Sequence, residues 1–491
     1  MFPPAGRCDG CRLRDRALAR LQERVAQLER DMARWQRRLA RLKKDNHRLR
    51  HELDEARRQA HRQAGHFRRN QLKKRKKKPG RRPGHRPDVR PTPPPERIDR
   101  VIKVPCRLCP DCGGPLVDPG QVEQYQTDLP PIVPIVTQFH IATGFCPCCR
   151  RRVQGRHPEQ TSDAIGAAGN TLGPVVLTMA AEMKHRLGVP YRKSCDFLAT
   201  YADFNVCPAT FVRAEQRLAE LARPTYDLLS DALRRCAIVH IDETGWRVES
   251  VNGWLWVFTN QNLTIYTIRT GEGARGANVP RDLLGPDFDG LIIVDGLQTY
   301  NVLDYRKGQC NAHLLRRTQE LLTTVPAEDR DLVEQLCRLV QQAIDLAKRR
   351  AELTVAGYAR RVADTDKRLD AWLLRAARRR RPLCPEVQRL ADHVANHYDE
   401  WFLFLHDANV PPTNNHAERM LRPAVITRKV GGCNKNLWGA LVHSILASLM
   451  VTCKQQGQKF LGLARQLWGL RTPTPIPLAE PPPKPARVGS T

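Results

Sequence analysis

One stretch constrains the fold of this chain more than any other: Ala237-Ile238-Val239-His240-Ile241-Asp242-Glu243-Thr244-Gly245-Trp246. An apolar, β-branched run that stops at an acid is typical of a buried strand with a carboxylate at its end. A second run of the same kind, from Gly290 to Gly296, ends in Asp295. Either aspartate alone fits a simple cap of a strand or a turn. Two in the same setting favour a shared divalent cation, because hard ions such as magnesium prefer carboxylate oxygens.

Charge narrows the class of partner. The 491 residues carry a formal net charge of +30, which points to a polyanion, and nucleic acid is the commonest one. The first 100 residues hold 32 Lys and Arg against 12 Asp and Glu, so most of the excess lies in one-fifth of the chain. No uninterrupted apolar stretch reaches the roughly 18 residues of a spanning helix, and the first residues lack the apolar part of a secretory signal. We therefore expect a cytosolic, reducing setting, no membrane, and 16 cysteines that serve as thiols or metal ligands.

The N-terminal region, residues 1–70, carries a heptad repeat. Its two apolar tracks are Leu18, Val25, Met32, Leu39, Asn46, Leu53 and Leu21, Leu28, Trp35, Leu42, Leu49, Ala56. Six sustained heptads predict a coiled coil, and Asn46 is the polar interruption that fixes register and favours a parallel dimer. The alternative is a single amphipathic helix lying on the body of the protein. Cys8 and Cys11 have the spacing of half a zinc site, but no second pair lies nearby.

Residues 71–100 form a basic, Pro- and Gly-rich arm. It opens with Lys73-Lys74-Arg75-Lys76-Lys77-Lys78 and contains no core-forming residues, so we expect it to be disordered in isolation. Such a segment suits salt-sensitive, sequence-independent contact with phosphates. A solvated linker is the plainer alternative, and both descriptions can hold together.

Two cysteine pairs mark residues 101–160 as a zinc-binding domain. The four ligands that we predict are Cys109, Cys112, Cys146 and Cys149, with 33 residues between the pairs. Paired C-x-x-C knuckles are a strong signature of a tetrahedral site, and four thiolates make it structural because no position is left open for catalysis. Cys106 and Cys148 are alternative ligands. The alternating stretch from Tyr125 to Ile141 predicts the strands of a zinc ribbon.

Residues 161–235 have a helical pattern. A helix over Tyr191–Tyr201, a break at 203–206 and a helix over Pro208–Leu221, with Cys207 near its N-cap, are expected. This arrangement is compatible with a DNA-binding helical pair. It fits two packed helices without a groove contact equally well.

The segments after Asp242 predict an α/β fold. Trp254–Phe258 and Thr264–Ile268 form a hairpin, and a helix over 277–284 leads to the Asp295 strand. This order is that of a ribonuclease-H-like core, in which the first strand is central and the fourth lies beside it. Such neighbours bring the two acids within reach of a common ion pair. We place the core at 236–310 and 409–471, with a helical insertion at 311–408 between its parts.

The insertion and the C-terminal part add charge. The insertion carries Arg375 and Arg378-Arg379-Arg380-Arg381, which suggest a basic face or simply a solvated charge run. A third acid, Glu418, follows Thr413 or Asn414 as the N-cap of a helix, where the helix dipole alone favours a carboxylate. Its neighbours Arg419, Arg422, Arg428 and Lys429 are cations suited to phosphate. A second apolar helix over 438–454 should pack on the sheet, and the Pro-rich tail from Thr472 to Thr491 is expected to be disordered.

These motifs together resemble the DDE transposases of the insertion sequence sixty-six family. The most specific match is Asn414-Asn415-His416-Ala417-Glu418-Arg419 followed by Leu421-Arg422-Pro423. Asp242-Glu243-Thr244, Asp295-Gly296, Cys310-Asn311-Ala312-His313 and Gly80-Arg81-Arg82-Pro83-Gly84-His85 support it, and the resemblance covers nearly the whole chain.

The resemblance implies a metal-dependent transposase. Asp242, Asp295 and Glu418 would bind two Mg²⁺ (or Mn²⁺) ions, which serve hydrolysis of a phosphodiester at the transposon end and then attack of the 3′-hydroxyl on target DNA. His313 and Arg419 would orient DNA or neutralise phosphate, although a packing role fits His313 as well. Implied partners are transposon ends, target DNA and a second copy of the chain through the coiled coil. A need for accessory proteins of the same element stays open. The rival hypotheses are a non-catalytic DNA-binding protein derived from a transposase and a branched-DNA nuclease of the same fold.

Overall fold

The computed structural model describes residues 24–29, 32, 84, 89–117, 120–379 and 381–479. Contacts divide the chain into two units, 1–127 and 128–491, and each is described by itself. Within the heptad region, residues 24–29 and 32 are helical, and Val25, Leu28 and Met32 are each more than half exposed. The other heptad positions, the Cys8–Cys11 pair and most of the basic arm lie outside the described residues.

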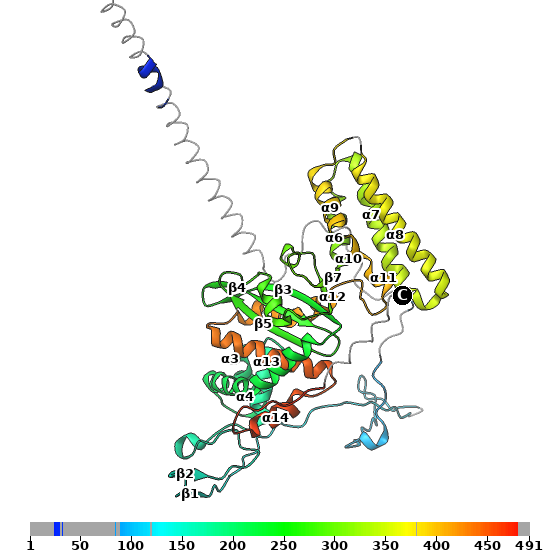
Figure 1. Ribbon diagram of the computed structural model, residues 1–491. Helices are drawn as coiled ribbons and strands as arrows, with labels where there is room; N and C mark the ends of the chain where they lie inside the picture. Colours follow the sequence, from blue (N-terminus) through cyan, green and yellow to red (C-terminus); the bar gives the residue numbers. More distant parts are fainter. Residues whose placement is uncertain are drawn as a thin grey trace, which may run out of the picture. The chain divides into compact units, whose positions relative to one another are not determined.

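A five-stranded mixed sheet forms the centre of the second unit (Figure 1). Its strands in chain order are β3 (Ile238–Val248), β4 (Val251–Thr259), β5 (Thr264–Thr270), β6 (Leu291–Val294) and β7 (Arg306–Gln309). Their spatial order is β5-β4-β3-β6-β7, with antiparallel β3–β4–β5 and parallel β3–β6–β7 pairings. The predicted hairpin and the predicted neighbourhood of the Asp242 and Asp295 strands are both confirmed.

Two details of the sheet differ from the expectation. Asp242 lies inside an 11-residue strand and not at its end, because antiparallel pairing with β4 continues to Val248↔Val251 after the parallel pairing with β6 has stopped at His240↔Ile293. Strand β7 was not predicted at all. Its sequence, Arg-Lys-Gly-Gln, has no apolar β-branched residue, and its pairing with β6 determines its conformation.

The two faces of the sheet are covered by different helices. On one face Val239 and Ile241 belong to a large core with α2 (Pro174–His185), α4 (Pro208–Arg234) and α5 (Asn278–Leu284). On the other face Trp246 and Val248 pack with α12 (Asn415–Gly431). Successive side chains of a strand point to opposite faces, so Asp242 faces the α12 side and Glu243 the other.

The apolar helix α13 (Leu437–Gln455) lies along strand β5 at the edge of the sheet (Figure 1). Two hydroxyl groups of α13 accept hydrogen bonds from amides on the edge of β5 that pairs with no strand in the described part of the chain. Ser448 Oγ accepts the Tyr266 N–H at 2.8 Å, and Thr452 Oγ1 accepts the Thr264 N–H at 3.0 Å. The helix is long and apolar enough to cross a membrane by length and composition, but most of it is buried inside the protein. Buried amides of the β5 edge that need an acceptor explain the presence of Ser448 and Thr452 in this apolar helix.

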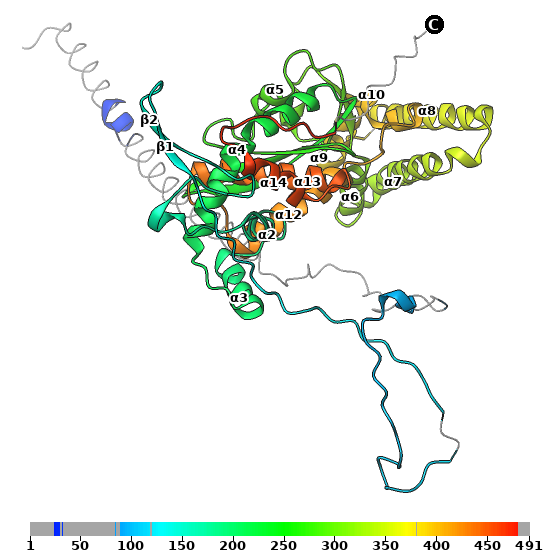
Figure 2. The ribbon, with the colours of Figure 1, turned by 90° about the horizontal axis from the view of Figure 1, so that it is seen from below.

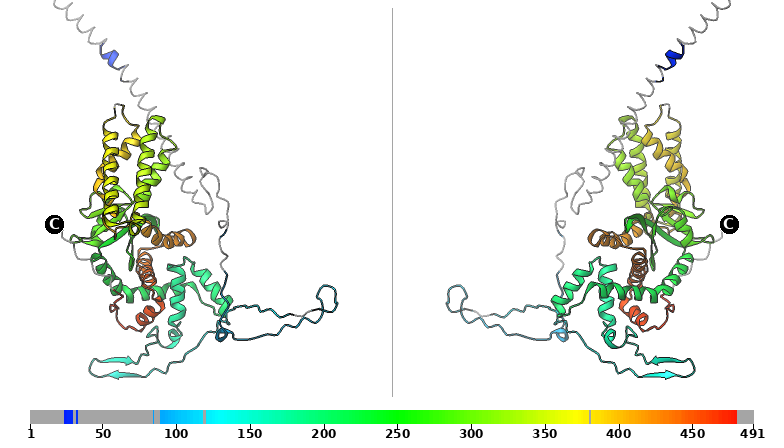
Figure 3. Two further views of the ribbon diagram at one scale, coloured as in Figure 1. Left: turned by 90° about the vertical axis from the view of Figure 1, so that its right-hand side faces the viewer. Right: turned by 90° about the vertical axis from the view of Figure 1, so that its left-hand side faces the viewer.

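The predicted insertion at 311–408 is mainly helical (Figures 1 and 3), and its helices share a core with Leu291 and Ile293 of β6. Its helices are α6 (Asn311–Leu321), α7 (Ala327–Lys348), α8 (Val355–Ala377), α9 (Pro385–Asn396), α10 (Tyr398–Trp401) and α11 (Leu403–His406). The two ends of the insertion are hydrogen-bonded to each other where they join the sheet. Asn311 Nδ2 donates to Trp401 O at 2.9 Å and to Pro412 O at 3.1 Å, and the Asn311 amide also donates to Pro412 O. We refer to this junction as the neck.

Three of the arginines at and just after the end of α8 are paired with acids. Arg375 and Arg379 pair with Asp331 at 2.6 and 2.8 Å, Arg379 also pairs with Asp329, and Arg381 pairs with Glu328 at 3.1 Å. These acids stand in the first turns of α7. The run therefore ties the two long helices of the insertion together.

The helical region before β3 contains α2, α3 (Tyr191–Ala202) and α4 (Figure 2). The predicted break is found, with Asp203 at φ +46° and Cys207 as the N-cap residue of α4. A buried polar cluster joins these helices to α13. In it His185 bonds Glu215 and His443, each at 2.9 Å, and Tyr191 donates to the same Glu215 at 2.5 Å.

The strands predicted over 125–141 are absent from the described residues, which are irregular there. Pro130, Pro131 and Pro134 remove amide donors from this stretch, which accounts for the failure of the alternating pattern. A short hairpin forms instead around the second cysteine pair, with β1 (Thr143–Cys146) and β2 (Arg151–Gln154). Short 3₁₀ turns occur at Pro95–Arg97, Gly166–Gly169, Gln298–Tyr300 and Arg350–Glu352.

The tail after α14 (Phe460–Gly469) is partly packed, contrary to the expectation of disorder from Thr472. Ile476 and Leu478 contact the large core, and the Ile476 amide donates to Thr225 Oγ1 at 2.9 Å. Two apolar residues among the prolines are enough to hold this segment on α4. Residues from 480 onward lie outside the described part.

Candidate active site

Asp242 and Asp295 leave neighbouring parallel strands at matching positions. The last parallel pair is His240↔Ile293, and each aspartate lies two residues beyond it. Local amides hold both carboxylates: the Glu243 N–H donates to Asp242 Oδ1 at 2.8 Å, and the Leu297 N–H to Asp295 Oδ1 at 3.2 Å. The strand register therefore sets the first two acids side by side at the edge of the sheet where the parallel pairing of β3 with β6 ends.

Glu418 is brought to the same edge by Asn414. The Asn414 side chain makes no capping bond to α12 and instead crosses to β3, where Nδ2 donates to Ile241 O at 2.7 Å and Oδ1 bonds His240 Nδ1 at 2.9 Å. The Asn414 amide donates to Cys310 Sγ, next to the start of α6. The first turn of α12, which carries Glu418, is thus fixed beside Asp242.

Electrostatics link the three acids. The pKa of Asp242 is raised to about 8, first by burial and then by the negative charges of Glu243, Asp295 and Glu418. A carboxyl group with this pKa is mostly protonated at neutral pH unless a cation compensates the surrounding charge. The acids that the sequence places far apart are therefore near enough in the fold to act on one another.

The two other predicted site residues differ in their placement. His313, in the first turn of α6, has Nε2 at 3.7 Å from Glu418 Oε1 and also lines a cavity with Asp295. His313 thus lies beside Glu418 and lines the same cavity as Asp295. Arg419 is exposed, and within the described residues it forms no hydrogen bond or ion pair.

The donor set suits a hard divalent cation. Asp242, Asp295 and Glu418 offer carboxylate oxygens, and their mutual repulsion is what a positive ion would relieve. Across the described residues, no three His, Cys, Asp or Glu side chains already stand in a coordinating arrangement. The three acids are thus close enough to interact electrostatically, but their carboxylates do not converge on one metal position.

Comparison with known proteins agrees with this geometry. The model of the family described as "Transposase IS66 family" matches residues 169–441, more than half of the chain. The chain belongs to this family. It is also similar to "Uncharacterized protein y4jD" of Sinorhizobium fredii (strain NBRC 101917 / NGR234), with 23% identity over 393 residues and 74% of each protein covered. The match of the IS66 family includes all three acids.

Glu243 of the IS66 chain has a structural role that its sequence context does not predict. Its buried carboxylate accepts Tyr300 Oη at 2.8 Å and Arg275 Nε and Nη2 at 3.1 and 2.9 Å. Thr299 Oγ1 adds a bond to Arg275 O. Burial and the charge of Asp295 raise the pKa of Glu243, while Tyr300 and Arg275 lower it. Glu243 thus ties the segment after Asp295 to strand β3.

The Asp295-Gly296 step requires its glycine. Gly296 has φ +84°, and a Cβ there would approach Gln309 Oε1 and the His393 ring to 3.3 Å. Any other residue would strain the backbone and press on Gln309 and His393. The dipeptide in the family motif therefore has a steric cause in this fold.

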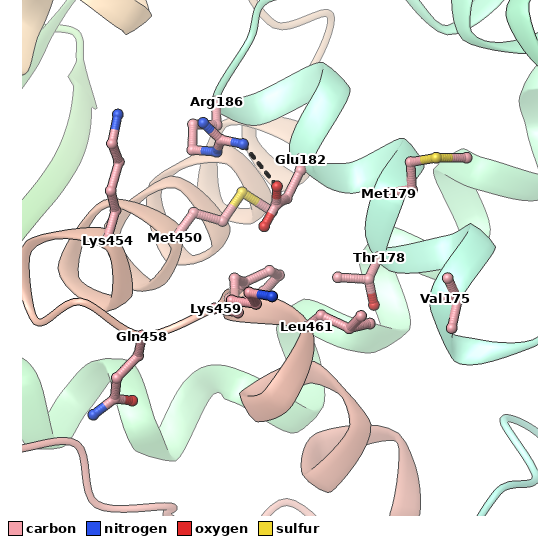
Figure 4. A pocket seen from close by; sticks show the side chains of 11 residues that line it. Val175, Thr178, Met179, Glu182, Arg186, Met450, Lys454, Gln458, Lys459 and Leu461 are labelled. Carbon is pink, nitrogen blue, oxygen red and sulfur yellow. Dashed lines mark hydrogen bonds and ion pairs between the residues drawn. The ribbon is translucent and has the colours of Figure 1, made fainter. Parts of the chain in front are cut away.

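Figure 4 shows a larger cavity of the IS66 chain. It has a volume of about 410 Å³ and is bordered by α2, α13 and α14, with Met179, Met450 and the ion pair of Glu182 with Arg186 in its wall. None of the three acids lines it. We do not assign the reaction to this cavity.

Both cysteine knuckles have one thiol that accepts backbone bonds. The pKa of the Cys109 thiol is lowered by the amides of Asp111 and Cys112 and by the Cys112 thiol. The pKa of the Cys146 thiol is lowered by the Cys149 amide and thiol and by the Cys148 amide. Cys106 Sγ instead donates to Leu108 O at 3.5 Å. The two knuckles belong to different units of the chain.

Proposed function

We propose that the chain is a DDE transposase that binds transposon ends, cleaves DNA by metal-dependent phosphodiester hydrolysis and transfers the 3′-hydroxyl ends to target DNA. The observation that carries the proposal is the gathering of Asp242, Asp295 and Glu418 at one edge of the sheet. Membership of a transposase family supports the reaction class.

The topology supports assignment of the catalytic part to the ribonuclease-H-like fold. Three antiparallel strands followed by two parallel ones, with the first strand central, give the order β5-β4-β3-β6-β7. Acids on the first and fourth of these strands and on a helix after the insertion occupy the positions that such a site needs. The catalytic core then comprises 236–310 and 409–471, and the insertion 311–408.

We assign Asp242, Asp295 and Glu418 as the residues that would hold two Mg²⁺ or Mn²⁺ ions. Such ions, when bound, supply charge stabilisation to the entering and leaving oxygens of an in-line displacement. Asn414 orients Glu418, and Glu243 holds the segment after Asp295. His313 stands beside Glu418 to orient the DNA strand, and exposed Arg419 is available to neutralise a phosphate.

A nicking assay tests the proposal. Purified protein is mixed with a duplex carrying the terminal repeat of the element, with Mg²⁺, Mn²⁺ or a chelator. We expect cation-dependent nicks and strand-transfer products, and loss of both in Asp242→Ala, Asp295→Ala and Glu418→Ala with DNA binding retained. The matched control is Asp304→Ala, an exposed acid in the loop before β7, which should cleave normally.

The outcomes separate the rivals. Binding without cleavage under every cation would favour a non-catalytic DNA-binding protein. Cleavage of branched DNA without strand transfer would favour a nuclease of the same fold. Full cleavage by any one of the three acid variants would remove that residue from the site.

We further propose a structural zinc site formed by Cys109, Cys112, Cys146 and Cys149, in a domain over 101–160. The support is the amide-to-sulfur bonding in each knuckle, which favours thiolates ready for a metal. Elemental analysis of the dialysed protein should find zinc, reduced by both Cys109→Ser and Cys146→Ser but not by exposed Cys207→Ser. Unchanged zinc in the first two variants would refute a shared site.

The remaining regions are proposed to bind DNA and to pair protomers. The heptads of 1–70 would form a homodimer, the arm 71–100 and helices of 161–235 would contact DNA, and 472–491 would form the tail. The exposed apolar residues Val25, Leu28 and Met32 are available for a partner helix. Sedimentation analysis should give a dimer that Leu28→Glu weakens, and an unchanged monomer in both proteins would overturn this assignment.

A further inference from the structure

A cavity of about 230 Å³ adjoins the second acid. Its wall includes Asp295 and Gly296 from the end of β6, His313, Arg316 and Arg317 from α6, and His393 from α9. The cavity is thus lined both by Asp295, a proposed metal ligand, and by the cationic side chains of Arg316 and Arg317. It lies between the sheet edge and the helical insertion.

The arginines of this wall lack counter-ions. Within the described residues, no hydrogen bond or ion pair joins Arg316 or Arg317 to another side chain, and Glu320, which also lines the cavity, pairs with neither. Arg317 is half-buried, and burial followed by the charge of Arg389 lowers its pKa. A partly desolvated guanidinium near a second cation is unfavourable without an anion.

Several arginines elsewhere in the insertion do have acidic partners. Arg375, Arg379 and Arg381 all pair with acids of α7. Arg389, which acts on Arg317, is itself paired with Glu386 at 3.0 Å. Arg316 and Arg317 are thus unpaired, within the described residues, at the wall of a cavity that Asp295 also lines.

The size of the cavity limits its ligand. At about 30 Å³ of liquid per water molecule it holds roughly seven waters, which is less than a drug-sized ligand site of roughly 300 Å³ or more. A phosphodiester group fits this volume, and guanidinium groups match its oxygens in a fork geometry. A base pair or a duplex does not fit.

We propose that this cavity binds a backbone phosphate of the DNA strand next to the scissile phosphodiester, with Arg317 as the principal contact and Arg316 at its side. This inference rests on the proposed transposase function and specifies how the substrate strand is held. Arg317 is a binding residue that does not touch the reacting atoms. The bound phosphate fixes which linkage reaches the acids, so the cavity determines the cleavage position.

The test combines protein variants with neutral linkages in the DNA. Single methylphosphonate linkages are introduced one at a time around the cleavage position of the terminal-repeat duplex, and cleavage rates are measured for the wild type and for Arg317→Gln. We expect one position at which the neutral linkage slows the wild type about tenfold or more. Arg317→Gln should be slowed to a similar extent on normal DNA and should be indifferent to that linkage.

Four controls complete the experiment. Arg375→Gln, which removes a paired arginine of the same insertion, should behave as the wild type. Arg317→Lys should recover part of the rate, and Arg316→Gln should show a smaller loss at the same linkage, which keeps the test possible if Arg317→Gln is unstable. Inorganic phosphate at millimolar concentration should not replace the DNA phosphate, and strong competition by it would assign the cavity to a free anion instead.

The results separate this inference from the function on which it rests. A wild type that never cuts would contradict the transposase function. A wild type that cuts, together with an Arg317→Gln protein equally fast and equally sensitive at every linkage, would overturn the phosphate site and leave the transposase function standing.

Discussion

At the scale of single residues, Glu243 connects β3 to the segment that follows Asp295. We expect Glu243→Ala to lower the free energy of unfolding by about 2–3 kcal/mol, because the buried Tyr300 hydroxyl loses its acceptor and Arg275 loses its ion pair. Arg275 is 44% exposed, so the pair contributes less than a fully buried one. Glu243→Gln should cost less, since an acceptor oxygen remains.

Urea denaturation of the full chain measures these differences. Glu272→Ala, at an exposed position before Arg275, is the matched control and should change the free energy of unfolding by less than about 0.5 kcal/mol. Equal stability of the Glu243→Ala and Glu272→Ala proteins would show that the Glu243 bonds do not hold this segment.

His443 should make the stability of the fold depend on pH. Burial, then the positive charges of His185 and Lys184, lower its pKa well below the ordinary value, and Nε2 has no partner within the described residues. The folded chain keeps this ring neutral, while the unfolded chain protonates it near pH 6.5. The contribution of His443 is therefore fully present above about pH 6.5 and is lost as the pH falls below it.

The expected slope is up to about 1.4 kcal/mol per pH unit from this one proton. Urea midpoints measured from pH 8 to pH 5 should fall more steeply for the wild type than for His443→Gln. His140→Gln, which alters an exposed histidine, should keep the wild-type slope. Parallel pH profiles for the wild type and His443→Gln would contradict the prediction.

At the scale of elements, the attachment of α12 to the sheet decides where Glu418 lies. Asn414→Ala removes the bonds to Ile241 O and to the His240 ring, so we expect a loss of about 2 kcal/mol and faster amide exchange in the first turn of α12. Cleavage should fall while DNA binding persists. Asn415→Ala, an exposed neighbour, is the control. Unchanged exchange in α12 would mean that other contacts set its position.

The sequence predicted elements best where the local pattern and the tertiary environment agree. The β4–β5 hairpin, the Asp295 strand and the helices of the insertion follow from periodicity alone. The strands over 125–141 failed because prolines removed their donors, and β7 was invisible because its partner strand determines it. Strand propensities read from a single segment do not take the partner strand into account.

The candidate site shows the same division. Asp242, Asp295 and Glu418 were predictable because acids after apolar strands and in a helical first turn are visible in sequence. The roles of Glu243 and Arg317 cannot be predicted from the sequence. The role of Glu243 depends on its contact with Tyr300, and that of Arg317 on a cavity formed by segments far apart in the chain. Asn414 was predicted as an N-cap but acts across the fold, which no spacing rule includes.

At the scale of the whole molecule, the charge of +30 should govern DNA affinity. Binding constants measured against salt concentration should fall steeply, with a slope close to −0.9 for each phosphate contact. Replacing the six cations from Lys73 to Lys78 by glutamine should reduce the magnitude of the slope by up to about five. Arg381→Gln, whose charge is already paired with Glu328, should leave the slope unchanged.

Fluorescence anisotropy with a terminal-repeat duplex at several salt concentrations gives these slopes. An unchanged slope after removal of the six cations would exclude the basic arm from contact with phosphates. A change in affinity without a change in slope would indicate that the arm acts through something other than charge.

The neck at Asn311 has a consequence for how this chain can vary. The chain leaves the sheet at Asn311 and returns at Pro412, and the bonds between these two residues hold the ends of the insertion together. We therefore expect that helices away from this junction and from β6 can be lengthened or shortened without shifting Glu418 relative to the sheet. Grafting helices from another protein into the insertion, with the neck preserved, would therefore change DNA binding while Asp242, Asp295 and Glu418 stay in place.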